Sequence, residues 1–92
     1  MINLTQKTYS QINKDIASRL ANIRKRKKIS QQELSRRSGV SYASIRRFET
    51  IGEISLASLT KLAIALGLED ELDNLFVQVP FDSIEEIIRG QS

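Results

Sequence analysis

The stretch that decides the fold is Ser30–Glu49, SQQELSRRSGVSYASIRRFE, because it spaces two short helices around one sharp turn. Ser30 and Glu33 have the S-x-x-E spacing of a capping box, which starts a helix. Gly39 suits the left-handed backbone that ends a helix, and Ser41 can cap the helix that follows. Two helices separated by only about four residues must cross steeply.

The second helix of this pair has two contrasting faces at about 100° per residue. One face carries an apolar stripe and a carboxylate, and the other carries small and basic side chains. The first face holds Ile45, Phe48 and Glu49, and the second holds Ala43, Arg46 and Arg47. We expect the apolar face to be buried and the arginines to project outward. A helix of this kind after a tight turn has the shape of a reader of the DNA major groove.

The outward residues suit contacts with base edges. The forked donors of arginine match the O6 and N7 acceptors of guanine, so at least one of Arg46 and Arg47 should read a base, and the other can hold a phosphate. Ala43 lies in the first turn, which penetrates deepest, and can contact a thymine methyl group. Tyr42 beside it either contacts a base or phosphate or is partly buried. Solvated surface arginines are the alternative for the pair.

Three segments extend the pattern: SQQEL at 30–34, SGVSYASIRRFE at 38–49 and LTKLAIALGL at 59–68. In this order they resemble the Xre/Cro-type helix-turn-helix family of bacterial and phage regulators, over about residues 14–76. The chain departs from many members after Glu49, where it reads Thr50-Ile51-Gly52-Glu53. The resemblance implies an all-α, five-helix lambda-repressor-like DNA-binding domain, followed by a short C-terminal strand and helical tail.

The resemblance also implies roles for individual residues. Gln31 would anchor a phosphate at the start of the first helix of the pair, helped by free backbone N–H groups, although it could be only a polar residue at a helix start. Ser41 would face base edges or adjacent phosphates. Glu49 would repel phosphates if it faced DNA, so we expect it to point inward and form a structural ion pair with Arg24.

Charge is divided along the chain. The net charge is +3 over 92 residues, but residues 19–52 hold ten Lys and Arg against two acids, and residues 53–92 hold two against eight. The first of these segments should face a polyanion such as double-stranded DNA. Its basic run at 25–28 is either a solvated helix end favoured by the helix dipole or a phosphate clamp, for which Lys27 and Lys28 are the candidates.

Composition excludes most catalytic chemistry. The chain has no Cys and no His, which excludes disulfides, zinc fingers and Cys/His or Ser/His catalytic pairs. Glu85 and Glu86 are adjacent and diverge by about 100° on a helix, so we interpret them as surface charges and not as a catalytic pair of carboxylates. We expect no enzyme activity, cofactor or metal. With no long apolar run and no signal pattern, we expect a cytoplasmic, nucleoid-associated bacterial protein without a membrane partner.

Outside the helix pair, periodicity divides the chain into a loose arm at 1–9, a helix-turn-helix domain at 10–76 and a tail at 77–92. A first helix should bury a stripe at helical spacing, a fourth should start near Ser55 and stop at Gly67, and a fifth should span 69–76. The stripe of the first helix is Ile12, Ile16, Leu20 and Ile23, and that of the fourth is Leu59, Leu62, Ala63 and Leu66.

The tail contains a β-prone run at 76–81 and a D-x-x-E box at 82–85 that opens a final helical turn. Its apolar side chains either fold back onto the core or contact a second copy or a foreign partner. The candidates are Val77, Val79, Phe81, Ile84, Ile87 and Ile88.

Two functions remain open from the sequence. The first is a repressor that reads a near-palindromic operator as a homodimer. The second follows from FETIGEISLASLTKLAIALG at 48–67 with VPFDSIEEI at 79–87, which together resemble HipB-like antitoxins. Such a protein would restrain a HipA-type kinase toxin through its tail while repressing its own operon.

Overall fold

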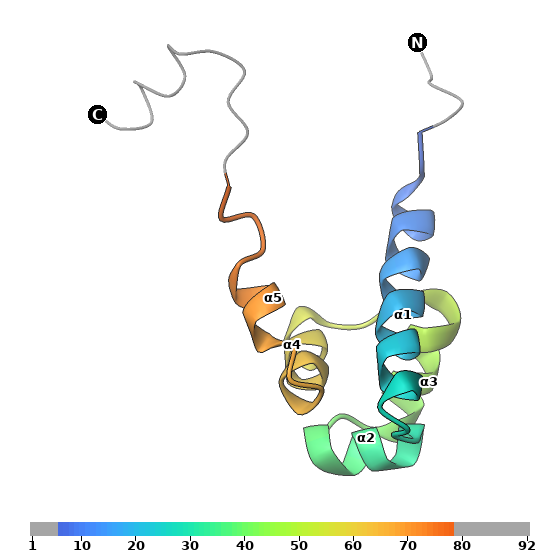
Figure 1. Ribbon diagram of the computed structural model, residues 1–92. Coiled ribbons are helices and arrows are strands. Elements are labelled where there is room, and N and C mark those ends of the chain that lie inside the picture. Colours follow the sequence, from blue (N-terminus) through green and yellow to red (C-terminus); the bar gives the residue numbers. More distant parts are fainter. Residues whose placement is uncertain (1–5, 79–92) are drawn as a thin grey trace.

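The computed structural model describes residues 6–78, and within them the fold is built from helices alone (Figure 1). This confirms the expected all-α, lambda-repressor-like architecture of five helices. The helices are α1 (Tyr9–Arg26), α2 (Gln31–Ser38), α3 (Tyr42–Ile51), α4 (Leu56–Ala65) and α5 (Glu69–Asp73).

The first helix begins with a capping box that the sequence reasoning missed. The backbone N–H of Gln11 donates to Thr8 Oγ1 at 3.2 Å, and the Thr8 N–H donates to Gln11 Oε1 at 2.9 Å. The T-x-x-Q spacing of these residues was the available signal. Lys7 Nζ also pairs with Asp15 Oδ2 at 2.5 Å, so the chain just before α1 is held against the helix. The helix starts inside the segment expected to be a loose arm.

One core joins the first four helices. α1 and α2 both pack against α3, and α4 packs against α2 and α5. The segments between helices contribute a side chain on each side of α2. The buried hydrophobic cluster consists of Ala17, Leu20, Ile29, Leu34, Val40, Ile45, Phe48, Leu62 and Leu66. The apolar face expected for α3 is therefore the buried one, and its basic face is left outside.

The expected apolar stripe of α1 is only partly correct. Leu20 is buried, but Ile12 and Ile16 are 47% and 38% exposed. The face of α1 that is buried instead holds Ala17 and Ala21, whose small side chains allow the helix to approach its neighbours closely. The spacing of the hydrophobic residues therefore predicted the helix correctly, but predicted which of its faces is buried only approximately.

Gly52 lets the end of α3 touch the backbone of α1. Its φ is +80°, in the left-handed region that ends a helix, and its N–H donates to the Phe48 carbonyl at 2.8 Å. A Cβ at this position would lie 2.9 Å from both the Asn13 carbonyl carbon and the Lys14 nitrogen. The position therefore requires glycine for space as well as for backbone conformation.

The fifth helix is shorter than expected, and no strand begins between its end and residue 78. α5 ends at Asp73: the Asn74 N–H still donates four residues back, to the Asp70 carbonyl at 2.9 Å, but the Leu75 N–H donates three residues back, to the Leu72 carbonyl at 3.2 Å. The Asn74 side chain adds a bond from Nδ2 to the same Asp70 carbonyl at 2.8 Å. Phe76 has φ +62°, which a β-strand cannot accommodate. The strand expected at 76–81 is thus wrong for residues 76–78, and its remainder lies outside the described residues.

Candidate nucleic-acid interface

Only one of the two hydrogen bonds of the capping box expected at the start of α2 forms. The N–H of Glu33 donates to Ser30 Oγ at 3.0 Å. The Glu33 carboxylate turns instead to Arg36 at 2.5 Å and Arg37 at 3.7 Å, one turn further along the helix. The hydrogen bond from Arg36 holds the pKa of Glu33 below its usual value. Charged donors on the same helix thus outcompete the backbone N–H of Ser30.

The turn between α2 and α3 is fixed by hydrogen bonds on both sides of Gly39. Gly39 has φ +77°, and its N–H donates to the Ser35 carbonyl at 2.9 Å. The Ser35 hydroxyl donates to the Val40 carbonyl at 2.6 Å, and the Val40 N–H donates to Ser38 Oγ at 3.1 Å. Val40 is 4% exposed. These contacts fix the direction in which α3 leaves the turn.

Ser41 caps α3 as expected. Its Oγ accepts the N–H of Ser44 at 3.1 Å and lies 2.8 Å from Ser44 Oγ. The residue is exposed at the helix N-terminus, where the positive end of the helix dipole attracts anions. A phosphate there would meet a serine that is already held in place.

All four side chains expected to read bases are exposed on α3, namely Tyr42, Ala43, Arg46 and Arg47. The guanidinium carbon of Arg46 lies 5.6 Å from the centroid of the Tyr42 ring, a distance at which the cation is attracted to the ring face. Tyr42 itself is 38% exposed, so it is neither fully free nor buried. The stacked pair gives Arg46 a supported position on the outer face of the helix.

Arg47 has a partner that the sequence reasoning missed. Its guanidinium pairs with the carboxylate of Glu53, in the loop after α3. Both side chains are well exposed, at 63% and 59%, so the pair is screened by solvent and contributes little to stability. The helix-ending Gly52 turns the chain back toward Arg47, but a separation of six residues carries no regular helical signal.

Behind the exposed face, Glu49 joins three helices through partly buried hydrogen bonds. Arg24 on α1 donates to its two carboxylate oxygens, from Nε at 2.8 Å and from Nη2 at 2.9 Å. Gln31 on α2 adds a bond from Nε2 to Glu49 Oε1 at 2.9 Å. Arg24 also donates from Nη1 to the Ile29 carbonyl at 2.8 Å. The ion pair expected between Arg24 and Glu49 is therefore present, with both side chains 9% exposed.

The surroundings of Glu49 keep it ionised. Burial alone would raise the pKa of this carboxyl, but the hydrogen bonds from Arg24 and Gln31, with the charges of Arg24 and Lys25, hold the pKa below its usual value. Glu49 is thus a neutralised internal anchor and does not repel DNA. Gln31 has its amide nitrogen committed to this cluster, so a phosphate at the start of α2 would meet backbone N–H groups of the first turn.

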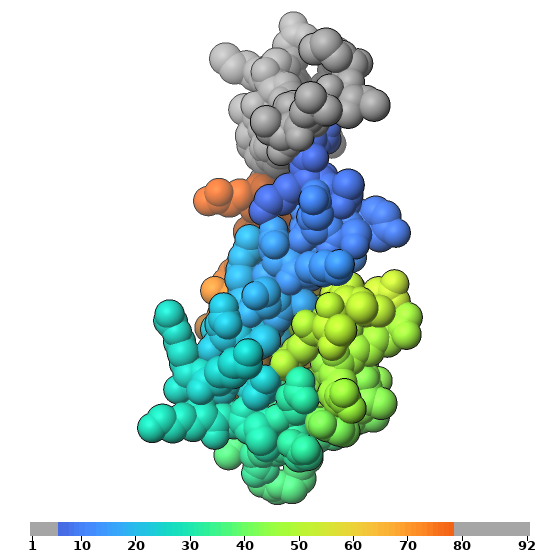
Figure 2. Space-filling model, turned by 90° about the vertical axis from the view of Figure 1, so that its right-hand side faces the viewer, coloured from blue at the N-terminus to red at the C-terminus, as the bar shows by residue number. Residues whose placement is uncertain are grey.

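The basic residues after α1 point elsewhere. Lys27 and Lys28 are exposed, and Lys28 has φ +59° in the tight connection to α2. The N–H of Lys28 donates to the Lys25 carbonyl at 2.9 Å. Figure 2 shows this end of α1 projecting on the side of the molecule away from α3. The structure does not place these lysines on the outward face of α3.

The remaining candidate residues belong to the tail. Val77 is 63% exposed, and the other tail candidates, at positions 79, 81, 84, 87 and 88, lie outside the described residues. Across residues 6–78 no group of acidic side chains is arranged to hold a metal ion. None of the helices in that range has the length and apolar character needed to cross a membrane.

Comparison with known families agrees with this geometry. A helix-turn-helix family model matches residues 20–72, which is more than half of the chain. The chain belongs to this Xre/Cro-type family of DNA-binding transcription regulators, and the resemblance drawn from the sequence is confirmed. No curated protein and no solved structure matches the chain significantly. The matched segment ends before the tail, so it leaves the antitoxin hypothesis untested.

Proposed function

We propose that this protein is a sequence-specific repressor that reads a near-palindromic operator as a homodimer in the bacterial cytoplasm. The observation that supports the proposal most is the outer face of α3, where Tyr42, Ala43, Arg46 and Arg47 are all exposed after a rigid turn. The partly buried bonds among Arg24, Gln31 and Glu49 support it further, because they fix α3 from behind. A rigid support of this kind lets base contacts form without an ordering penalty.

Each outward residue has a distinct task in this proposal. Arg46 reads a guanine through its forked donors, and its position over the Tyr42 ring restricts it to few orientations. Ala43 contacts a thymine methyl group. Arg47 exchanges its exposed partner Glu53 for a guanine or a phosphate. Binding thus begins by releasing a weak ion pair.

Phosphate contacts come from the two helix starts. The first-turn N–H groups of α2, beginning at Gln31, and the exposed Ser41 cap of α3 both offer donors beside positive helix ends. The Gln31 side chain takes a supporting role because it is bonded to Glu49. Lys27 and Lys28 are the weaker phosphate candidates, since they follow the end of α1, which projects on the side of the molecule away from α3 (Figure 2).

The homodimer is the part of the proposal that rests on the sequence. One domain of this size covers little DNA, and a two-fold pair reading two half-sites is the usual solution. We assign the dimer contact to the apolar residues of the tail, including Ile84, Ile87 and Ile88. The HipB-like alternative, in which the tail contacts a toxin kinase, stays a hypothesis, because Val77 and Gln78 are the only tail residues that the structure describes.

A DNA selection with the purified chain tests the proposal. Random duplexes should yield two half-sites in inverted orientation, with centres about one helical turn of about 10 base pairs apart. Sedimentation should give a dimer, and the double variant Ile84→Asp, Ile88→Asp should sediment as a monomer with much weaker operator binding. Failure to enrich any sequence, or enrichment of a single half-site by a stable monomer, would contradict the proposal.

A further inference from the structure

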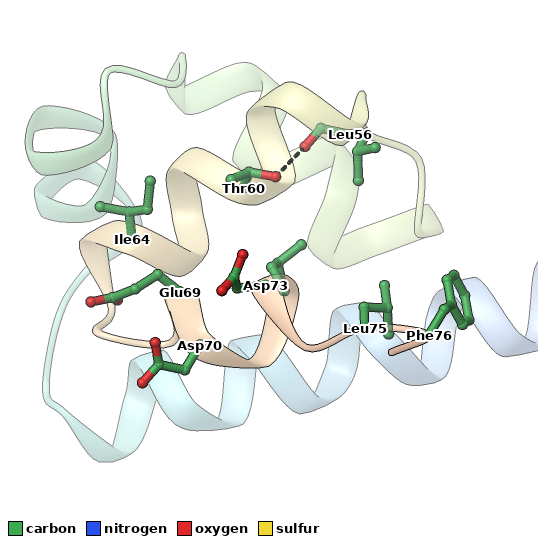
Figure 3. A pocket seen from close by; sticks show the side chains of 9 residues that line it. Leu56, Thr60, Ile64, Glu69, Asp70, Asp73, Leu75 and Phe76 are labelled. Atoms are coloured by element: carbon green, nitrogen blue, oxygen red, sulfur yellow. Dashed lines mark hydrogen bonds between the residues drawn. The ribbon is translucent and has the colours of Figure 1, made fainter. Parts of the chain in front are cut away.

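An apolar groove lies between α4 and α5, away from the helix-turn-helix. Figure 3 shows it with its lining side chains, and it encloses about 590 Å³. Four of its large hydrophobic side chains are unusually exposed: Leu56 at 69%, Ile64 at 58%, Leu75 at 52% and Phe76 at 87%. Contiguous exposed side chains of this size mark interaction sites on small proteins.

The floor of the groove is a straight ridge along α4. Leu56, Thr60 and Ile64 follow one another at intervals of four residues and therefore lie on one face of the helix. The Thr60 hydroxyl donates to the Leu56 carbonyl at 3.0 Å, so its one hydrogen-bond donor is used within the helix. The floor is therefore mainly apolar and has no free side-chain donor over about 12 Å, the length of eight residues of helix.

The rim of the groove is acidic. α5 contributes Glu69, Asp70 and Asp73 to the lining (Figure 3). Within residues 6–78 none of these three carboxylates forms an ion pair. Three unpaired negative charges beside an apolar floor favour a ligand that brings apolar side chains and positive charge together.

We propose that this groove binds a basic amphipathic helix of another protein. Residues 6–78 contain no strand, so an extended peptide finds no sheet edge to pair with, whereas a ridge on one helix accepts the groove of another. The ligand helix would place an apolar stripe on Leu56 and Ile64 and its Lys or Arg side chains toward Asp70 and Asp73. This inference is independent of the operator and of the DNA contacts proposed above.

Charge argues against two other occupants. The chain's own residues 79–92 carry Asp82, Glu85 and Glu86 against Arg89, so they would bring more negative charge to an acidic rim. A second copy of the same face would oppose Glu69, Asp70 and Asp73 with identical carboxylates. Both arrangements place like charges together in a partly desolvated contact, which is unfavourable.

The groove can be filled while DNA is bound. In Figure 1, α5 lies on the left of the molecule and α3 on the right, beyond α4. A partner in the groove would therefore leave the outer face of α3 free.

A display selection tests the inference directly. A library of peptides of about 16 residues, long enough for four helical turns, is panned against the immobilised full chain. We expect enriched peptides to carry a net positive charge and apolar residues at i, i+3 or i+4, and i+7. Affinity of one synthesised winner is then measured by fluorescence anisotropy against the wild-type chain and the variants below.

Matched variants make the result decisive. Ile64→Ser should weaken the winner by about tenfold, whereas Ile12→Ser, at an exposed position on α1, should leave its affinity unchanged. The double variant Asp70→Asn, Asp73→Asn should weaken binding by several-fold and reduce its salt dependence. Melting curves establish that each variant is folded, which is expected because the substituted side chains are exposed. The inference is overturned if nothing is enriched, if the winners are acidic, or if Ile64→Ser binds like wild type.

Discussion

Glu49→Ala removes the internal anchor of α3 and is expected to lower stability strongly. The carboxylate accepts two bonds from Arg24 and one from Gln31, and the pair is 9% exposed on both sides. After the substitution Arg24 keeps only its bond to the Ile29 carbonyl and remains as a buried cation without a counter-charge. Breaking one partner of a buried pair typically costs about 3 to 5 kcal/mol.

We place the expected loss at about 3 kcal/mol, the lower end of this range, because the two bonds between Arg24 and Glu49 are only partly buried. A domain of this size has a total stability of about 5 to 14 kcal/mol, so the loss is a large share of it. Urea unfolding followed by circular dichroism should show a lower midpoint with an unchanged slope.

Glu33→Ala is the matched control, because it also removes a glutamate that pairs with arginine. Glu33 is partly exposed and its partners Arg36 and Arg37 are exposed, so the midpoint should shift far less. Equal midpoints for Glu49→Ala and wild type would refute the reasoning, as would equal shifts for the two variants.

Three further outcomes are expected. Folding lowers the pKa of Glu49, so the ionised carboxylate stabilises the fold fully above its unfolded pKa of about 4.3, and this stabilisation is lost as the pH falls through the folded pKa. Lowering the pH through that window should therefore reduce the unfolding free energy of Glu49→Gln less than that of the wild type. Gly39→Ala should cost about 1 kcal/mol of unfolding free energy for backbone strain alone, and Gly52→Ala about 3 kcal/mol, because only Gly52 lacks space for a Cβ; equal losses would show that the contact with α1 relaxes. Glu53→Gln should strengthen binding to any duplex by several-fold by freeing Arg47, measured by anisotropy at low salt, and unchanged or weaker binding would mean that Glu53 helps position that arginine.

Much of the fold could be predicted because its signals are local. The glycine at 39 and the serines at 30, 41 and 55 act through bonds to their immediate neighbours, and the structure has those bonds. The rotation of α1 could not be predicted as well, because it depends on contacts with distant helices that favour Ala17 and Ala21 over Ile12. The early end of α5, where the Leu75 N–H bonds three residues back instead of four, has no periodic signal in the sequence.

The candidate site divides in the same way. Which residues of α3 face outward followed from helical periodicity, and the partner of Glu49 followed from the family resemblance. The bond from Gln31 to Glu49 and the pair between Arg47 and Glu53 needed coordinates. Both join residues whose separation in sequence gives no fixed separation in space, so no periodic pattern could reveal them.

The measurement that tests the central claim most directly is a DNA selection repeated with Arg46→Ala, beside the wild type and Arg19→Ala. If α3 reads bases, Arg46→Ala should lose about 1 to 3 kcal/mol on the selected site and lose preference at one defined base pair. Arg19→Ala removes the same charge from α1 and should weaken all sequences slightly without changing the preference. An Arg46→Ala protein that selects the wild-type site with wild-type affinity would contradict the account, because the outer face of α3 would then not be what reads the DNA.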